Sequence, residues 1–257
     1  MHRDVSVVLL HGQPGTGSDW DSVVHALPPR LRTLAPDRPG YRANPLPPGT
    51  FRENAEWLVR ELDRADAQDV ILVGHSYGGG VAITVAALAP ERVRGLVLVS
   101  SIGPGCLDHW DPVLAAPVVG EVCAVAAWWL TPWFARHVLA RVERRRDRPL
   151  AHHEHVNWTA WANADHHHGE VWRTFLTEQR SLVHGLDELN SLLGEIVAPT
   201  VVIADPADKM IPFDTAEALR DQVPGARLVL VGEGGHHLPR RVPDVIAAEI
   251  VRLAQVP

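Results

Sequence analysis

A serine held between two glycines is the residue of this chain best suited to chemistry. The segment Gly74-His75-Ser76-Tyr77-Gly78 follows an apolar run at residues 70–73 and precedes a run of small residues at 78–89. A strand–turn–helix junction of this kind lifts the serine out of a sheet, and the glycines avoid side-chain clashes. The helix N-terminus would favour developing negative charge. The pattern predicts a nucleophilic Ser76; a glycine-rich turn with an incidental serine is the alternative.

A nucleophilic serine needs a base, and the base needs an acid to orient it. His236 and His237 lie late in the chain, directly after a glycine-rich stretch, and either could act as the base. Asp205 and Asp208 follow an expected strand, where a loop can reach a histidine. In folds with this nucleophile turn the acid lies between serine and histidine in the chain. We predict Asp208 as the acid and interpret Asp205 as a turn-stabilising residue.

The loop His11-Gly12-Gln13-Pro14-Gly15 follows the first apolar run, residues 5–10. In a fold of this kind such a loop supplies a backbone N–H to the oxyanion of a tetrahedral intermediate. The N–H groups of Gln13 and Tyr77 are the predicted pair of donors. One such donor lowers the barrier by about 3 kcal/mol.

A dinucleotide site is the rival interpretation of the same loop. Gly12, Gly15 and Gly17 follow a strand, and Asp37 lies twenty residues beyond Gly17. The spacing is G-x-x-G-x-G, however, whereas the dinucleotide fingerprint is G-x-G-x-x-G. Neither tyrosine has a lysine four positions later, as a short-chain reductase would require. We therefore expect no cofactor.

The order of apolar runs predicts an α/β fold. Strand-like and helix-like segments alternate over residues 1–104 and again over 194–257, which is typical of parallel strands joined by helices. Residues 105–193 hold no clear strand but contain seven of the nine tryptophans. We predict that this stretch is an inserted helical cap between two parts of one sheet-containing core. The 257-residue length suits this single unit.

Five segments together resemble the successive motifs of the α/β-hydrolase superfamily. They are His11–Gly15, Asp37–Tyr41, Gly74–Gly79, Asp208–Pro212 and Gly235–Pro239. The resemblance covers about two thirds of the chain and implies a doubly wound, mostly parallel sheet with a helical cap. It also implies a catalytic triad of Ser76, His236 and Asp208, which favours His236 over His237.

Comparison with individual branches of the family narrows the expected chemistry. The usual first two strands are missing, as in members similar to plant methylesterases and hydroxynitrile lyases. Those lyases carry a lysine beside the catalytic histidine, where this chain has His237. Dehalogenases and epoxide hydrolases of the superfamily use aspartate where this chain has Ser76. The resemblance therefore favours a serine hydrolase acting on a carboxylic ester or lactone.

The substrate is expected to carry an apolar or aromatic group. Some cap tryptophans form the core of the cap, but we expect others to line the pocket. The candidates are Trp128, Trp129, Trp133, Trp158 and Trp161. The same triad could instead support C–C bond hydrolysis, perhydrolysis or a slow-turnover ligand receptor, and sequence does not separate these.

Composition excludes several other classes of partner. The formal net charge of −7 argues against nucleic acid, which needs a basic surface. No apolar stretch reaches the roughly 20 residues of a membrane span, and the start of the chain does not resemble a signal peptide. We expect a cytoplasmic protein with free thiols at Cys106 and Cys123, possible homodimerisation and a small-molecule substrate. The histidine-rich residues 152–168 are interpreted as solvated, with no metal site.

Overall fold

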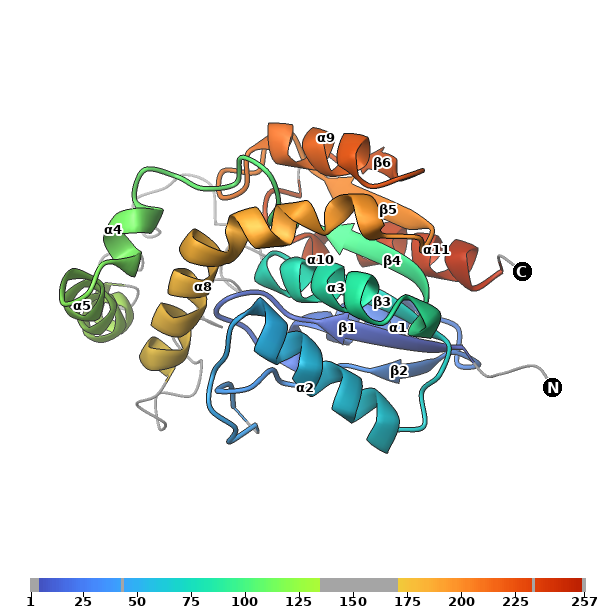
Figure 1. Cartoon of the computed structure of the whole chain (residues 1–257), viewed down its shortest axis with the longest axis horizontal. Helices are drawn as coiled ribbons and strands as arrows, with labels where there is room; N and C mark the ends of the chain where they lie inside the picture. Colours follow the sequence, from blue (N-terminus) through green and yellow to red (C-terminus); the bar gives the residue numbers. More distant parts are fainter. Residues whose placement is uncertain (1–4, 43, 135–170, 233, 256–257) are drawn as a thin grey trace, which may run out of the picture.

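Six parallel strands form a single sheet in the computed structural model, which describes residues 5–42, 44–134, 171–232 and 234–255 (Figure 1). The strands pair in the order β2-β1-β3-β4-β5-β6. This order confirms the predicted α/β class, because neighbours such as β1 and β3 must be joined by crossovers. The strand bounds are β1 Ser6–Leu10, β2 Arg32–Leu34, β3 Val70–His75, β4 Val93–Val99, β5 Thr200–Ala204 and β6 Arg227–Leu230.

Helices cover both faces of the sheet, which explains why its central strands are continuously aliphatic. Alternate side chains of β1 and β3 enter two separate apolar clusters, one on each face. One face packs against α2 (Phe51–Arg64), α3 (Tyr77–Leu88) and α9 (Phe213–Gln222). The other packs against α1 (Asp21–Ala26) and α11 (Pro243–Ala254).

The order in which strands are added reverses beside β1. The chain runs from β1 outward to β2, then crosses back to place β3 on the other side of β1. In open α/β sheets, ligands bind outside the carboxyl ends of the strands at such a point. The loop after β1 and the serine turn after β3 lie at this end of the sheet.

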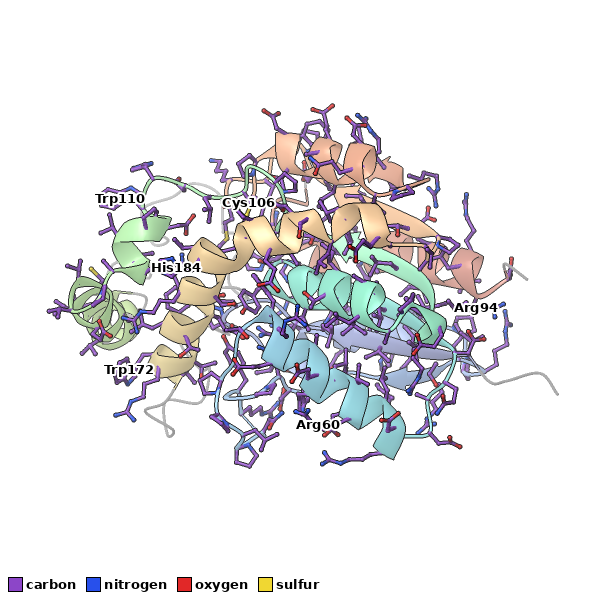
Figure 2. The ribbon with its side chains drawn as sticks, in the orientation of Figure 1. Arg60, Arg94, Cys106, Trp110, Trp172 and His184 are labelled. Carbon is purple, nitrogen blue, oxygen red and sulfur yellow. The ribbon has the colours of Figure 1, made fainter. Side chains whose placement is uncertain are left out.

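The described residues between β4 and β5 form helices and no strand. They include α4 (Asp111–Ala115), α5 (Val119–Phe134) and α8 (Val171–Ser191), which lie at the carboxyl end of the sheet with Trp110 and Trp172 (Figures 1 and 2). The later half of α8 lies over α2 and α3 and contributes apolar side chains to their cluster, namely Leu182, Leu186 and Leu189. Helix α8 therefore connects the helical insertion to the core. The boundaries at residues 104 and 193 stay predictions.

One further α-helix lies near the candidate site. Short helix α10 (Leu238–Arg241) follows the loop that carries His236. No helix among the described residues is both long and apolar enough to cross a membrane.

A close backbone contact between α3 and the end of β1 predicts the effect of one substitution. A Cβ added to Gly78 would lie 2.4 Å from the Leu10 carbonyl oxygen and 2.5 Å from that of His11. We expect Gly78→Ala to lower the free energy of unfolding by about 2 kcal/mol or more, because backbone cannot move aside as a side chain can. Urea unfolding followed by circular dichroism measures this.

Gly194→Ala is the matched control, because a Cβ there meets nothing within 4 Å. Equal stability of the two variants would contradict the close approach of α3 to β1.

Candidate active site

Ser76 occupies the single-residue turn between β3 and α3. Its backbone angles are φ +52° and ψ −121°, a conformation that costs a non-glycine residue about 1–3 kcal/mol. Ser76 is partly exposed, whereas His75 before it and Tyr77 after it are buried. The turn therefore presents the hydroxyl-bearing residue at the surface of an otherwise buried strand–helix unit.

Gly74, two residues before Ser76, and Gly79, in the first turn of α3, leave no space for a side chain. A Cβ at Gly74 would lie 2.4 Å from the Gly78 carbonyl oxygen, and one at Gly79 would lie 2.0 Å from Ser101 Oγ. The turn is also anchored to β4, because the Ser76 N–H donates to the Val99 carbonyl at 3.1 Å. Neighbouring strands thus hold the strained conformation in place.

His236 and Asp208 come together from two loops after β5 and β6. His236 Nδ1 lies 2.9 Å from Asp208 Oδ2, and both side chains are buried. Burial opposes ionisation of Asp208, but the hydrogen bond and charge of His236 and two backbone N–H groups outweigh it. They hold the pKa of Asp208 below its ordinary value, so the carboxylate can accept from the imidazole. The structure therefore pairs Asp208 with His236.

Asp205 fastens the histidine loop to the end of β5. Its Oδ1 accepts from the Ala207 N–H at 2.8 Å, which confirms the predicted role in the turn. Its Oδ2 accepts from the N–H groups of Gly234 and Gly235, each at 2.6 Å. Burial opposes the charge, yet these three donors lower the pKa of Asp205. A buried carboxylate thus fixes the two residues that precede His236.

His75 is a second contact of this loop, and sequence reasoning assigned it no role. Its imidazole is buried, and Nε2 donates to the His236 carbonyl at 2.9 Å. Burial, followed by the charge of His236, holds the pKa of His75 well below its ordinary value, so the ring stays neutral. Its position inside the G-x-S-x-G motif was the available signal.

His237, the competing base, lies beside the pair. Its ring centroid is 5.5 Å from that of His236. Burial, with the charges of His236, Arg240 and Arg241, lowers the pKa of His237 to about 4. The described contacts of Asp208 run to His236, so geometry favours His236 as the oriented imidazole.

The loop after β1 approaches the serine turn closely. A Cβ on Gly12 would lie 3.2 Å from Ser76 Cβ and 2.9 Å from His75 Nδ1. Within the described part of the chain, the backbone N–H groups of Gln13 and Tyr77 donate to no other protein atom. The loop and the serine turn therefore lie side by side with two backbone donors unused.

A fully buried arginine supports this loop from behind. Arg38 donates to the His11 carbonyl at 3.0 Å and to the Gly12 carbonyl at 2.8 Å. It also forms an ion pair with Glu178 of α8, whose carboxylate accepts from the Tyr41 hydroxyl at 2.6 Å. Burial disfavours the guanidinium charge, but Glu178 holds the pKa of Arg38 above its ordinary value.

Sequence reasoning did not assign Arg38 a role. It lies within a motif already quoted for the family resemblance, Asp37–Tyr41, but nothing in the sequence marks it as buried.

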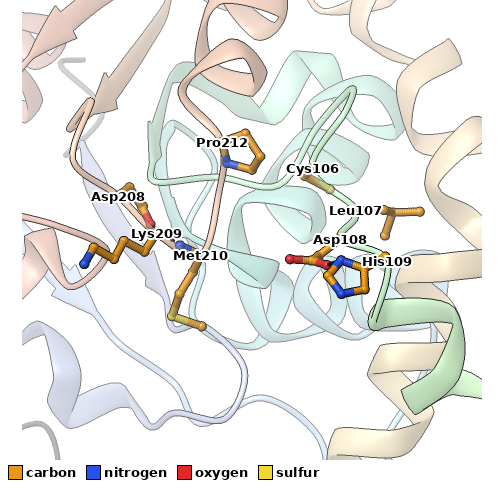
Figure 3. Close-up of a pocket in the computed structure, with 8 residues that line it drawn as sticks. All are labelled: Cys106, Leu107, Asp108, His109, Asp208, Lys209, Met210 and Pro212. Atoms are coloured by element: carbon orange, nitrogen blue, oxygen red, sulfur yellow. Dashed lines mark hydrogen bonds and ion pairs between the residues drawn. The ribbon is translucent and has the colours of Figure 1, made fainter.

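A pocket of about 400 Å³ lies between the loop after β4 and the Asp208 loop (Figure 3). Its walls combine apolar and charged side chains from Cys106, Leu107, Asp108, His109, Asp208, Lys209, Met210 and Pro212. Cys106 and Cys123 are free thiols, and burial raises the pKa of Cys106 to about 11.

The predicted tryptophan lining and the histidine-rich region stay predictions. Trp128, Trp129 and Trp133 lie on α5, but their side chains are outside the described set. Trp158, Trp161 and residues 152–168 lie outside the described residues. Among the residues that are described, no group of three or more histidine, cysteine, aspartate or glutamate side chains is arranged to hold a metal ion.

Comparison with known proteins agrees with this fold. Residues 5–239 match the family model for the alpha/beta hydrolase fold. The chain belongs to this family and is a hydrolase of the α/β fold.

Two curated relatives cover most of the chain. It is 29% identical over 244 residues to a 2-hydroxymuconate semialdehyde hydrolase from Pseudomonas sp. (strain CF600), covering 90% of this chain and 80% of the relative. It is 27% identical over 261 residues to a pimeloyl-[acyl-carrier protein] methyl ester esterase from Yersinia enterocolitica, covering 98% and 94%.

A solved haloalkane dehalogenase from Bradyrhizobium elkani has the same fold. It superposes with a TM-score of 0.74 at 22% identity, covering 99% of this chain and 92% of that one. At this identity the likeness concerns the fold alone.

The buried ion pair predicts a large loss of stability when one partner is neutralised. Glu178→Gln leaves the Arg38 charge buried without a counter-charge, which typically costs about 3–5 kcal/mol. Urea unfolding measures the change. Glu188→Gln on the same helix is the matched control, because its ion pair with Arg52 is exposed and should leave the unfolding midpoint unchanged. Similar midpoints for the two variants would contradict the buried network.

Acid should destabilise the chain through its buried histidines. Burial is the largest cause that lowers the pKa of His11, His75 and His237, the last to about 4. The unfolded chain protonates them near pH 6.5, so it binds more protons than the folded chain between about pH 6.5 and 4. The free energy of unfolding therefore falls as the pH drops through this window, and urea midpoints from pH 7.5 to 4.5 measure it.

His237→Asn should reduce this loss, whereas His25→Asn at an exposed position of α1 should not. The lowered pKa values of Asp205 and Asp208 add a further loss only near pH 4 and below. A midpoint that stays flat from pH 6.5 to 4.5 would contradict the prediction.

Proposed function

We propose that this chain hydrolyses a carboxylic ester or lactone through an acyl-enzyme on Ser76. The observation that carries the proposal is a partly exposed serine on a strained turn, beside a loop whose histidine is hydrogen-bonded to a buried carboxylate. A serine, an imidazole and an orienting acid are the groups that acyl transfer requires. The relative named as a methyl ester esterase, which aligns with nearly the whole chain, supports the same reaction class.

In this mechanism Ser76 Oγ attacks the carbonyl carbon while His236 Nε2 takes the hydroxyl proton. Asp208 accepts from Nδ1 and stabilises the imidazolium that forms. The C–O bond to the leaving alcohol then breaks, and His236 returns its proton to the alkoxide. Water attacks the acyl-enzyme with His236 again as base, which releases the acid and restores Ser76.

The N–H groups of Gln13 and Tyr77 are the proposed oxyanion donors. Gln13 follows Gly12 and Tyr77 follows Ser76, and Gly12 packs against Ser76. Arg38 holds the two carbonyls that precede Gln13, so it orients this loop without touching the substrate. Fixed donors stabilise the oxyanion because they need no reorganisation during the reaction.

An apolar or aromatic group in the substrate remains part of the proposal. Leu107, Met210 and Pro212 give the pocket beside Asp208 an apolar component. Asp108, His109 and Lys209 also line it, so a polar portion of the substrate would find partners there. A preference for short acetate esters over aromatic ones would contradict the proposed substrate class.

C–C bond hydrolysis is the second candidate, because the Pseudomonas relative named as a 2-hydroxymuconate semialdehyde hydrolase aligns with 90% of this chain. The triad and oxyanion donors would serve either reaction. Turnover of a vinylogous diketone acid in preference to every ester of a panel would favour this candidate over ester hydrolysis.

Ser76→Ala should lower kcat/KM on an aryl ester by about 10³-fold or more, because no other group forms the acyl-enzyme. The same variant should no longer react with a fluorophosphonate probe. Ser191→Ala, at an exposed end of α8, is the matched control and should retain both signals. Full ester turnover by Ser76→Ala would overturn the mechanism.

A further inference from the structure

A chain of side-chain hydrogen bonds runs from the proposed oxyanion loop to the helical insertion. Gln13 Nε2 donates to Gln179 Oε1 of α8 at 3.0 Å, and Gln179 Nε2 donates to Asp111 Oδ1 of α4 at 2.7 Å. Helices α4 and α8 lie against each other at the carboxyl end of the sheet (Figure 1). Gln179 is 3% exposed, so the middle of the chain is shielded from water.

The Asp111 carboxylate, at the far end of this series of hydrogen bonds, determines which side chain donates and which accepts in each of them. Asp111 can only accept, and its Oδ2 already accepts from the Asp108 N–H at 2.6 Å. Gln179 must therefore turn its amide nitrogen toward Asp111 and its oxygen toward Gln13. Gln13 must in turn give its nitrogen to Gln179, because the opposite orientation would place two acceptors 3.0 Å apart.

The remaining polar atom of these hydrogen-bonded side chains is Gln13 Oε1, which is buried and has no hydrogen-bond partner among the described residues. Leaving a buried acceptor unpaired is costly, so such an atom calls for a partner. Gln13 directly follows Gly12, which packs against Ser76. The unpaired acceptor thus belongs to the residue whose N–H is the proposed oxyanion donor.

We propose that Gln13 is a specificity-determining residue whose Oε1 accepts a hydrogen bond from an O–H or N–H of the substrate, close to the scissile carbonyl. The inference rests on the proposed function and narrows its substrates to hydroxy- or amino-substituted esters and lactones. Asp111 acts through Gln179 as a positioning residue, because it keeps the atom presented to the substrate an acceptor. An analogue with a methyl group in place of the hydroxyl leaves Oε1 unpaired.

Two pairs of esters test the specificity. Methyl mandelate is compared with methyl 2-phenylpropanoate, and methyl 3-hydroxy-3-phenylpropanoate with methyl 3-phenylbutanoate, by pH-stat titration of the full chain. The hydroxy ester of at least one pair should have a kcat/KM about ten- to a hundredfold higher, the range expected for one unpaired buried acceptor. In Gln13→Met the preference should disappear. Preferences below twofold in both pairs, or a preference that survives in Gln13→Met, would overturn the proposal.

Asp111→Asn tests the relay, since an amide no longer dictates the direction of the bonds and Gln13 can present its nitrogen. Methyl benzoylformate, which carries a ketone acceptor, is then compared with methyl mandelate. The hydroxy-to-keto ratio of kcat/KM should fall about tenfold from wild type, and the intrinsic reactivity of the ketone cancels in this comparison. Glu56→Gln, an exposed carboxylate-to-amide change on α2, should leave the ratio unchanged. An unchanged ratio in Asp111→Asn would refute the positioning role of Asp111.

Labelling by a fluorophosphonate separates the failure of this inference from that of the proposed function. If Ser76 is not labelled, or Ser76→Ala still turns over ester, the proposed function fails. If Ser76 is labelled but hydroxy and methyl esters behave alike, only the inference fails. Where ester turnover is too slow to follow, the esters are compared instead by how strongly each protects Ser76 from the fluorophosphonate. Equal protection by the two esters of each pair overturns the proposal. Thermal unfolding of Gln13→Met and Asp111→Asn confirms that each variant is folded.

Discussion

The charge of Arg38 has no access to water, and three separate parts of the chain must surround it. The carbonyls of His11 and Gly12 and the carboxylate of Glu178 accept from the guanidinium, which also lies over the Tyr41 ring. The Tyr41 hydroxyl donates to the same Glu178 carboxylate. An unpaired buried charge is strongly destabilising, so the loop after β1 and helix α8 cannot move apart independently. The same contacts fix the peptide that precedes Gln13. Stability of the fold and orientation of the candidate site therefore depend on one ion pair.

The candidate site is assembled beside β1, at the point where the order in which strands are added reverses. Strand β3 lies between β1 and β4, and both neighbours contribute contacts to the Ser76 turn. The strained backbone at Ser76 persists because these contacts over-determine it. The histidine loop is held in the same way, by Asp205 at the end of β5 and by His75 at the end of β3. Each candidate catalytic group is thus positioned by buried polar contacts to rigid elements rather than by its own loop.

Much of this arrangement is predictable from the amino-acid sequence. Continuous aliphatic runs at β1, β3 and β4 indicate buried parallel strands, and these strands pair in parallel in the sheet. The segment Thr50–Glu53 has the Thr-x-x-Glu pattern of a capping box, and both hydrogen bonds of that box are present at the start of α2. The pairing of Asp208 with His236 agrees with the motif order, whereas His75 and Arg38 were missed. Both lie within quoted motifs, but their importance depends on burial and on long-range partners, which those motifs do not reveal.

The sequence by itself determined the fold class, the serine turn and the order of the candidate triad, because these depend on local periodicity and on closely spaced motifs. Spacing alone leaves the adjacent His236 and His237 as equal candidates, and only the family resemblance favours His236. The tertiary structure shows the contact itself, because it places the His236 imidazole against Asp208. The tertiary structure also decided which atom of the Gln13 side-chain amide bonds to Gln179 and which atom is left unpaired. Gln13, Gln179 and Asp111 are far apart in sequence, and hydrogen-bond direction passes between them only after α4 and α8 have packed. Which side chain donates and which accepts in such a series depends on the contacts made in the fold, and these contacts cannot be read from spacing along the sequence.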